Sequence, residues 1–444
     1  MRHGRSDVST AQDQGRFRRG IRRVALDVTP LRTARDFRLL WLGELVSVTG
    51  SQISLVAVFV QVYALTHSSA AVCLVGLCQL VPLVLFTIFG GPIIDSHDRR
   101  RLLIGATLLQ SGTSSLLLVG ALIGHPPLAL VYVAAGLGGG FGGFALSVRS
   151  AMLPNLVEPR QLPVALSLNQ VMWNTCLIVG PGVGGVIIDE LGLATAYAID
   201  VGSFAAILAA AWMMRSQAPA PSEQPAAAAV TGSWRKVVEG FHFLRGRRVL
   251  QAAFYADLVA MIFGMPRALF PVLAVTQFHA GTKIVGALFS AVSVGAVIGA
   301  LTTGWVGQVR RQGLAVLVAV AVWGMGIAAF GLVGDNLGLA FLLLAVAGGA
   351  DVISAVFRGT ILQLSVPDDL RGRMSAVHIL VVTGGPRLGD LEAGLVASAF
   401  TPTISVVSGG VACIAGVVIL AIAIPDFARF RMHVLPPVHE VAAS

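Results

Sequence analysis

Charged residues are scarce in this chain. Only 12% of the 444 residues are Asp, Glu, Lys or Arg, whereas 55% are hydrophobic, and the mean hydropathy is +0.81. Soluble domains contain about 25% charged residues, so this composition excludes an ordinary water-soluble domain. Lysine is rarer still, since Lys236 and Lys283 are the only two. The arginines behind the net charge of +9 occupy short stretches between apolar runs instead of one soluble face, which argues against nucleic-acid binding.

Cysteines and catalytic motifs are also few. The four cysteines all fall inside apolar runs, so neither a disulfide framework nor a paired-cysteine metal site is expected. The sequence has no H-E-x-x-H, nucleophile elbow or Walker motif. We therefore expect no enzyme activity, no cofactor and no metal. The first 36 residues lack the apolar stretch of a cleavable signal peptide, so the first span is expected to direct insertion.

Long apolar runs are abundant. A helix needs about 20 residues to cross a bilayer, and twelve runs of that kind follow one another along the chain. They cover residues 37–65, 71–94, 102–124, 128–152, 164–188, 194–214, 249–275, 284–306, 313–334, 337–362, 375–400 and 403–424. The sequence thus predicts an all-α polytopic membrane protein with twelve transmembrane helices.

Arginines gather in alternate connections between these runs. They lie in the N-terminal tail, in even-numbered loops and in the C-terminal tail, for example at Arg99, Arg310, Arg371 and Arg429. Under the positive-inside rule, these loops and both termini are cytoplasmic. The lipid bilayer is the first partner that the sequence predicts.

The twelve spans divide into two pseudo-symmetric halves. When the sequences of the two halves are aligned, Glu44 matches Asp257 and Arg149 matches Arg358. Matched residues are separated by about half the chain, which indicates an internal repeat. A Pro- and Ala-rich linker followed by an amphipathic stretch around Trp234 divides them. The predicted units are a basic cytoplasmic tail (1–36), a six-helix bundle (37–215), a linker with an interfacial helix (216–248), a second six-helix bundle (249–424) and a cytoplasmic tail (425–444).

The loop after the second span carries a motif, GGPIIDSHDRR. Gly91, Asp95, Arg99 and Arg100 resemble the loop motif of the major facilitator superfamily, although Asp98 stands where glycine is usual. The resemblance implies a conformational latch, in which the carboxylate caps the next helix and the arginines bridge to acids. The alternative is that these arginines only obey the positive-inside rule.

The fifth span carries a second motif, GPGVGG. Gly180, Pro181, Gly184 and Gly185 resemble the antiporter motif of the same superfamily. Proline kinks a helix and glycines let helices approach closely, so this span could seal one face of the bundle. Small residues also simply pack membrane helices, and that interpretation remains open.

Further strings, including MPRALFP, ADVISAVFRGTI and PRLGDLEAG, are similar to the branch of bacterial siderophore and drug exporters that contains the enterobactin exporter. This resemblance implies a monomeric transporter in the bacterial inner membrane that exports an amphipathic small molecule by proton antiport with alternating access. An importer or uniporter of the same fold is one alternative. A membrane-embedded enzyme or receptor is another.

Charges inside the spans are expensive and are usually functional or paired. Glu44 and Asp257 occupy equivalent places on the first helix of each half, and neither has a base within reach on its own span. A desolvated carboxylate without a partner binds a proton more readily. We therefore predict that these two acids carry the coupling protons; the alternative for Glu44 is a purely structural residue bonded to neighbouring hydroxyls such as that of Ser47.

The remaining intramembrane charges lie mainly in the second half. Arg387 and Asp390 share a helix face, and with Asp351 they are predicted to form an ion network near Glu392. Arg267 lies about 15 Å from Asp257 along the helix, in a segment that two prolines should break, and it could contact an anionic substrate. In the first half, Asp200 is expected to lie near the outer surface and to be hydrated.

Overall fold

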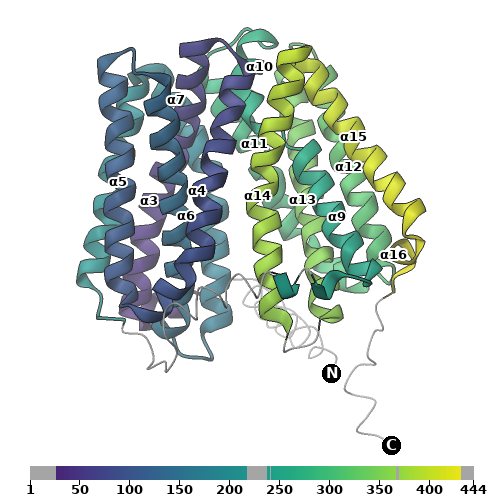
Figure 1. The fold of residues 1–444 in the computed structure, drawn as a ribbon, viewed down its shortest axis with the longest axis horizontal. Coiled ribbons are helices and arrows are strands. Elements are labelled where there is room, and N and C mark those ends of the chain that lie inside the picture. The colour runs from purple at the N-terminus through teal and green to yellow at the C-terminus, as the bar shows by residue number, and fades with distance from the viewer. Residues whose placement is uncertain (1–26, 218–237, 241, 367–369, 432–444) are drawn as a thin grey trace, which may run out of the picture.

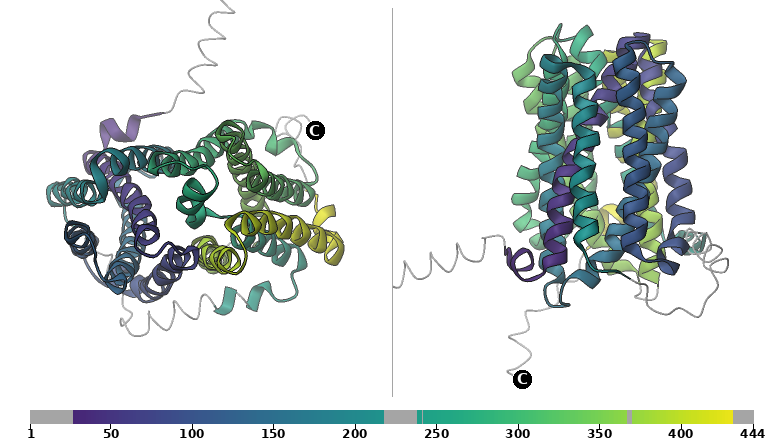
Figure 2. Two further views of the ribbon diagram at one scale, coloured as in Figure 1. Left: turned by 90° about the horizontal axis from the view of Figure 1, so that it is seen from above. Right: turned by 90° about the vertical axis from the view of Figure 1, so that its left-hand side faces the viewer.

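The computed structural model describes residues 27–217, 238–240, 242–366 and 370–431. Helices make up two side-by-side groups, which stand upright in Figure 1 and are seen end on in the left view of Figure 2. The first group contains α2 (Thr29–Thr33), α3 (Arg35–Thr66), α4 (Ser69–Ser96), α5 (Arg99–Ile123), α6 (Leu128–Leu156) and α7 (Leu162–Met213).

The second group continues the chain through ten further elements. They are α9 (Arg248–Phe263), η1 (Arg267–Leu269), α10 (Phe270–Thr276), α11 (Thr282–Leu301), η2 (Thr303–Gln308), α12 (Gln312–Leu332), α13 (Leu337–Ser365), α14 (Arg371–Ala399), α15 (Pro402–Ala423) and α16 (Pro425–Arg429). No strand occurs within the described ranges.

Helix α7 contains two antiparallel arms. Its first arm runs parallel to α3, since Leu168 lies beside Trp41 and Gly184 beside Ile53. Its second arm runs the other way, with Ser203 packed against Gly50. The reversal occurs at Gly192, whose φ of 83° is a left-handed conformation that glycine adopts without strain.

Ten described segments are long and apolar enough to cross a membrane by length and composition. That number counts α7 once and omits α14, which carries Arg387, Asp390 and Glu392. If both arms of α7 and also α14 are counted, the number would equal the twelve spans that the sequence predicts. In span seven, α9 ends at Phe263 and η1 and α10 follow, so the predicted break beside Arg267 is confirmed.

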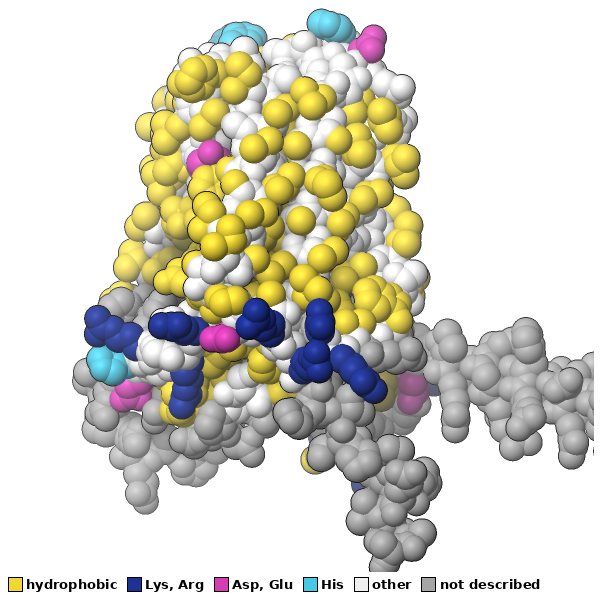
Figure 3. Space-filling model, turned by 90° about the vertical axis from the view of Figure 1, so that its right-hand side faces the viewer, with side chains coloured by type: hydrophobic (Ala, Val, Ile, Leu, Met, Phe, Trp, Pro, Cys, Tyr) yellow, Lys and Arg dark blue, Asp and Glu magenta, His cyan; other side chains and the backbone are white. Residues whose placement is uncertain are grey.

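Charge is distributed unevenly along the long axis of the bundle. Lys and Arg side chains form a band near one end of the face in Figure 3, and apolar side chains cover most of the surface beyond it. We call this the basic end; α3, α5 and α9 begin there. Hydrogen-bonding caps close helices at both ends, with Asp98 capping α5 at the basic end and Asn336 capping α13 at the opposite end.

Several predicted segments lie wholly or partly outside the described residues. Of the basic tail, only residues from 27 onward are described, and α2 lies within them. The predicted interfacial helix around Trp234 is described only at 238–240 and 242–244, which are helical. Of the C-terminal tail, residues 432–444 are not described.

The two halves meet toward the opposite end. There α7 crosses α11, and α4 crosses α14. A Cβ on Gly185 would lie 3.0 Å from the Cα of Gly286, and a Cβ on Gly394 would lie 2.3 Å from the Cβ of Cys73. Such close backbone approach is possible because these helices present glycine at their crossing points.

Candidate transport site

Two buried ion pairs occupy equivalent places in the halves. In the first, Arg149 of α6 lies 3.1 Å from Glu44 of α3; in the second, Arg358 of α13 lies 2.9 Å from Asp257 of α9. The two acids are 2% and 1% exposed, and both arginines are buried. The expectation of unpaired carboxylates is therefore wrong, because each acid finds its base on the fourth helix of its own half.

Arg149 is close to the end of the predicted span 128–152. It lies inside α6, which continues to Leu156, and its guanidinium points into the bundle toward Glu44. The repeat alignment had matched Arg149 with Arg358 and Glu44 with Asp257. It thus contained both pairs, although alignment alone does not show that the members of each pair touch.

In the second half the ion pair extends to a third charge. Arg358 lies 3.8 Å from Asp351 and also donates to the hydroxyl of Ser354. Asp351 therefore joins Arg358 and not the predicted Arg387–Asp390 network. One arginine is placed between two acids, so the second-half cluster carries a net negative charge when both are ionised.

The predicted network on α14 does not form. Arg387 donates to the backbone carbonyl of Thr383 at 2.7 Å, whereas Asp390 accepts from the backbone N–H of Ala268 at 3.3 Å. In the described part of the chain, no ion pair within 4.0 Å joins Arg387 to Asp390 or involves Glu392. Asp390 instead holds the beginning of the broken outer segment of span seven.

A cavity of about 360 Å³ lies within the first half and reaches α14. Its polar lining includes Ser47, Ser51, Gln52, Ser54, Gln79, Gln110, Thr113, Ser114, Arg149, Asp200, Thr383 and Arg387. Trp173 and several leucines add apolar surface. The cavity thus combines many uncharged hydrogen-bonding groups with one acid, Asp200, and two arginines, one of which belongs to the other half.

Asp200 does not lie in a hydrated outer position. It is 2% exposed and lines the cavity, where it accepts hydrogen bonds from Ser51 and Ser114. Asp200 is therefore buried in the interior of the bundle and not exposed at its surface. Sequence position along the span placed it near the outer surface, but the kink of α7 and its packing against α3 turn it inward.

Helix α5 is capped by a different acid of the preceding loop than the motif implied. Asp98 accepts from the N–H of Arg100 at 2.9 Å and also from Ser216 and Gln217, at the end of α7. Burial raises the pKa of Asp98, but these hydrogen bonds outweigh it and hold the pKa below its usual range. Asp95 is exposed. The departure from glycine at position 98 therefore supplies the cap.

The two motif arginines bind backbone groups of the first half. Arg99 donates to the carbonyl of Ala151 at 3.0 Å, and Arg100 donates to the carbonyls of Ala211 and Trp212 at 2.7 and 2.6 Å. These carbonyls lie at the basic-end termini of α6 and α7. The arginines thus tie three helix ends together instead of bridging to acids.

The antiporter-like motif packs α7 between the halves. Gly180 and Gly184 face α3, since Cβ atoms there would lie 2.4 Å from Gln52 and 3.1 Å from Ile53. Gly185 faces α11 of the other half, and Pro181 presents its carbonyl to Gly286. The motif therefore lies at the junction of the two halves.

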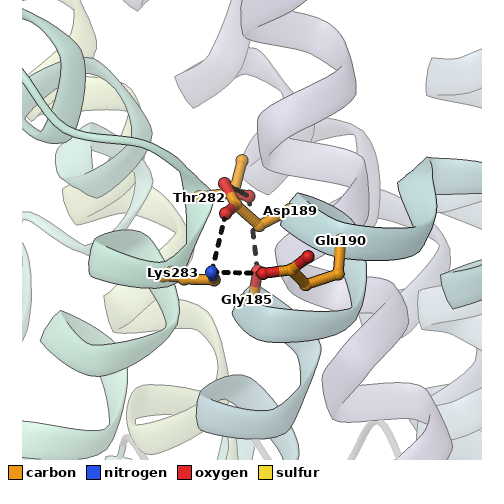
Figure 4. A network of polar contacts seen from close by, with 5 residues as sticks. All are labelled: Gly185, Asp189, Glu190, Thr282 and Lys283. Carbon is orange, nitrogen blue, oxygen red and sulfur yellow. Dashed lines mark hydrogen bonds and ion pairs between the residues drawn. The ribbon is translucent and has the colours of Figure 1, made fainter.

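A polar network closes the same junction at the end farther from the basic end (Figure 4). The Lys283 ammonium lies 2.5 Å from Glu190 and 3.3 Å from Asp189. The Thr282 hydroxyl binds Asp189 and the carbonyl of Gly185. Each contact in this network joins a residue of α7 to a residue of α11. These contacts would therefore break if the halves separated here.

A family profile described as "Transmembrane secretion effector" matches residues 26–440. The chain belongs to this family of major facilitator transporters. The enterobactin exporter EntS of Citrobacter koseri is 27% identical over 427 residues, which cover 94% of this chain and 98% of that protein. EntS of Salmonella typhimurium is 26% identical over 426 residues, with the same coverage.

Solved structures show the same fold. The nucleoside transporter NupG superposes with a TM-score of 0.70 at 12% identity, covering 88% of this chain and 98% of that one. A bacterial homologue of the iron transporter ferroportin, in an inward-facing state, gives 0.65 at 15% identity, covering 89% and 99%. The protein is thus a multi-pass membrane transporter of the major facilitator fold and not an enzyme.

Proposed function

We propose that this transporter exports an amphipathic small molecule, a siderophore or a drug-like compound, across the bacterial inner membrane by proton antiport with alternating access. The observation that carries the proposal is a polar cavity beside one of two equivalent buried ion pairs. The names of the relatives favour a siderophore. Glutamines, hydroxyls and Trp173 suit a polyhydroxylated aromatic molecule, and Arg149 and Arg387 suit one with anionic groups.

The side from which the cavity would be loaded is inferred from charge and packing. The positive-inside rule makes the basic end cytoplasmic. The halves meet toward the other end, through Gly185, Gly286 and the Lys283 network. With that junction closed, the substrate would enter from the cytoplasm, and the junction would open for release.

Proton coupling is assigned to the two ion pairs. Protonation of Glu44 or Asp257 removes the charge that holds Arg149 or Arg358, so it frees a buried arginine and changes the packing of the first helix of that half against the fourth. Asp351, Asp390 and Glu392 are further acids through which a proton could pass. Arg267 and Arg387 are proposed to contact the substrate, because each lies where the halves meet.

Inside-out vesicles test the exporter directly. With an acidic lumen, vesicles that contain the transporter should accumulate enterobactin, and the accumulation should collapse when the pH gradient is dissipated. Metabolite profiling of a deletion strain under iron limitation identifies the natural substrate. If right-side-out vesicles instead took up the substrate when the pH gradient was applied, the protein would be an importer. If uptake did not depend on the pH gradient, the protein would be a uniporter.

Topology gives a second test. Reporter fusions should be external after Gly124, Phe278 and Asp335 and cytoplasmic at His97, Glu158 and Arg310, because arginines gather on the second set of loops. Alkaline phosphatase and green fluorescent protein provide opposite readouts. An external signal at Ala226, which lies outside the described residues, would contradict the division into six spans and six spans.

The loop motif is proposed to act as a latch, and its two acids can be separated experimentally. Asp98→Ala removes the cap of α5, so unfolding in detergent should need about 1 kcal/mol less. Asp95→Asn should leave the unfolding temperature unchanged but slow turnover, because Asp95 is exposed here and would act only in the other conformation. Wild-type turnover of Asp95→Asn would contradict the latch.

A further inference from the structure

Asp200 is a buried acid that the transport mechanism above does not use. It lies on the second arm of α7 and lines the cavity. Within the described residues, no Lys, Arg or His approaches it within 4.0 Å. An ionised carboxylate in this position lacks a compensating charge, and such burial is unfavourable by several kcal/mol.

Serine hydroxyls from two other helices surround this carboxylate. The Ser114 hydroxyl of α5 lies 2.7 Å from Oδ2, and the Ser51 hydroxyl of α3 lies 3.3 Å from Oδ1. Ser54, three residues further along α3, faces the same group. Three hydroxyl oxygens and two carboxylate oxygens thus converge from three helices.

The chain brings these oxygens together through a close helix crossing. A Cβ at Gly50 would lie 2.2 Å from the Ser203 hydroxyl and 3.2 Å from the Cα of Asp200, so only glycine lets α3 approach α7 this closely. Ser51 and Ser54 follow at once on α3. Ser203 turns its own hydroxyl to the carbonyl of Asp200 and so stabilises the local backbone.

The other charged and titratable groups near Asp200 are already engaged. Arg149 lines the same cavity but pairs with Glu44, and Arg387 binds the carbonyl of Thr383. The Tyr197 hydroxyl, one turn before Asp200, donates to Gln61. None of these groups therefore supplies a positive charge to an ionised Asp200.

We propose that Asp200, Ser51, Ser54 and Ser114 bind a small monovalent cation, sodium. Hard cations prefer oxygen ligands, and a divalent ion is normally held by more than one carboxylate. Here one carboxylate matches one positive charge. No group of three His, Cys, Asp or Glu residues suited to a metal occurs in the described part of the chain. Asp200 is 2% exposed and lines the cavity, through which an ion can reach it.

Thermal unfolding of the purified full-length protein tests this site without any transport assay. Sodium chloride should raise the unfolding temperature saturably, by about 2 °C or more, relative to choline or potassium chloride at equal ionic strength. Asp200→Asn should abolish the response, and Ser114→Ala should weaken it. The matched control is Ser115→Ala, whose hydroxyl binds only the carbonyl of Ser111; it should keep the full response.

Three results would overturn the proposal. An equal effect of all the salts would show a general ionic effect. A sodium response that survives in both Asp200→Asn and Ser114→Ala would place the ion elsewhere. An unfolding temperature that follows pH but not sodium would show that Asp200 binds a proton instead. Each would leave the exporter proposal untouched, because the vesicle experiment tests that separately.

Discussion

Arg358→Gln should abolish gradient-driven transport and destabilise the protein by about 3–5 kcal/mol. The substitution leaves Asp257, which is 1% exposed, as an uncompensated buried charge with Asp351 nearby. Asp257→Asn should be milder for folding, because it removes the acid and leaves Arg358 with Asp351. It should nevertheless end accumulation while sparing substrate exchange, which needs no proton release.

The double variant Asp257→Asn/Arg358→Gln separates folding from coupling. It should recover most of the stability lost in Arg358→Gln, because no buried charge of the pair remains, yet it should not recover accumulation. Thermal unfolding and vesicle uptake measure the two properties. Glu44→Gln and Arg149→Gln repeat the experiment in the first half. If Asp257→Asn still releases protons on substrate binding and accumulates substrate, the coupling assignment fails.

The second large effect is expected at the junction of the halves. Gly185→Ala places a Cβ 2.7 Å from the carbonyl of Thr282 and 3.0 Å from the Cα of Gly286, so the halves can no longer close there. Transport should fall at least about tenfold, which corresponds to only about 1.4 kcal/mol between the two states. A cysteine introduced at Ser290 should become accessible to an impermeant thiol reagent.

Gly202→Ala is the matched control for this experiment. Gly202 lies on the same helix, and a Cβ there meets no described atom within 4 Å. Its transport and the labelling of Ser290→Cys should remain at the level of the parent protein. Equal behaviour of Gly185→Ala and Gly202→Ala would show that the crossing of α7 and α11 does not close the transporter.

The sequence predicted the spans and the family because both depend on properties read along the chain. Apolar runs of sufficient length mark helices, and Pro266 and Pro271 mark the break around Arg267, which η1 and α10 confirm. The reversal inside α7 follows from Gly192 and from the change of contacts along α3. These features need no knowledge of how one helix is rotated against another.

The charge pairs depended on that rotation, and the sequence predictions failed there. Glu44 was predicted to be unpaired because no base lies within reach on its own span, but its partner Arg149 lies on another helix, α6. Asp351 turned to Arg358 and not to α14. The sequence predicted that Asp95 would cap α5. The cap is Asp98 instead, because α5 begins at the very next residue. The repeat alignment held a usable signal, because it matched the two acids with each other and the two arginines with each other. Each half therefore has an acid on its first helix and an arginine on its fourth helix that could form a pair.

The Lys283 network also makes the protein unusually simple to monitor by chemistry. Lys236 is the only other lysine in the chain; in the sequence it lies between the two six-span halves, outside the residues that the structure describes. The Lys283 amine is held by Asp189 and Glu190, so its nucleophilic form should be suppressed while the halves touch. The rate at which an impermeant amine reagent modifies this one position would therefore report how often the junction opens, in the unmutated protein and without an attached probe.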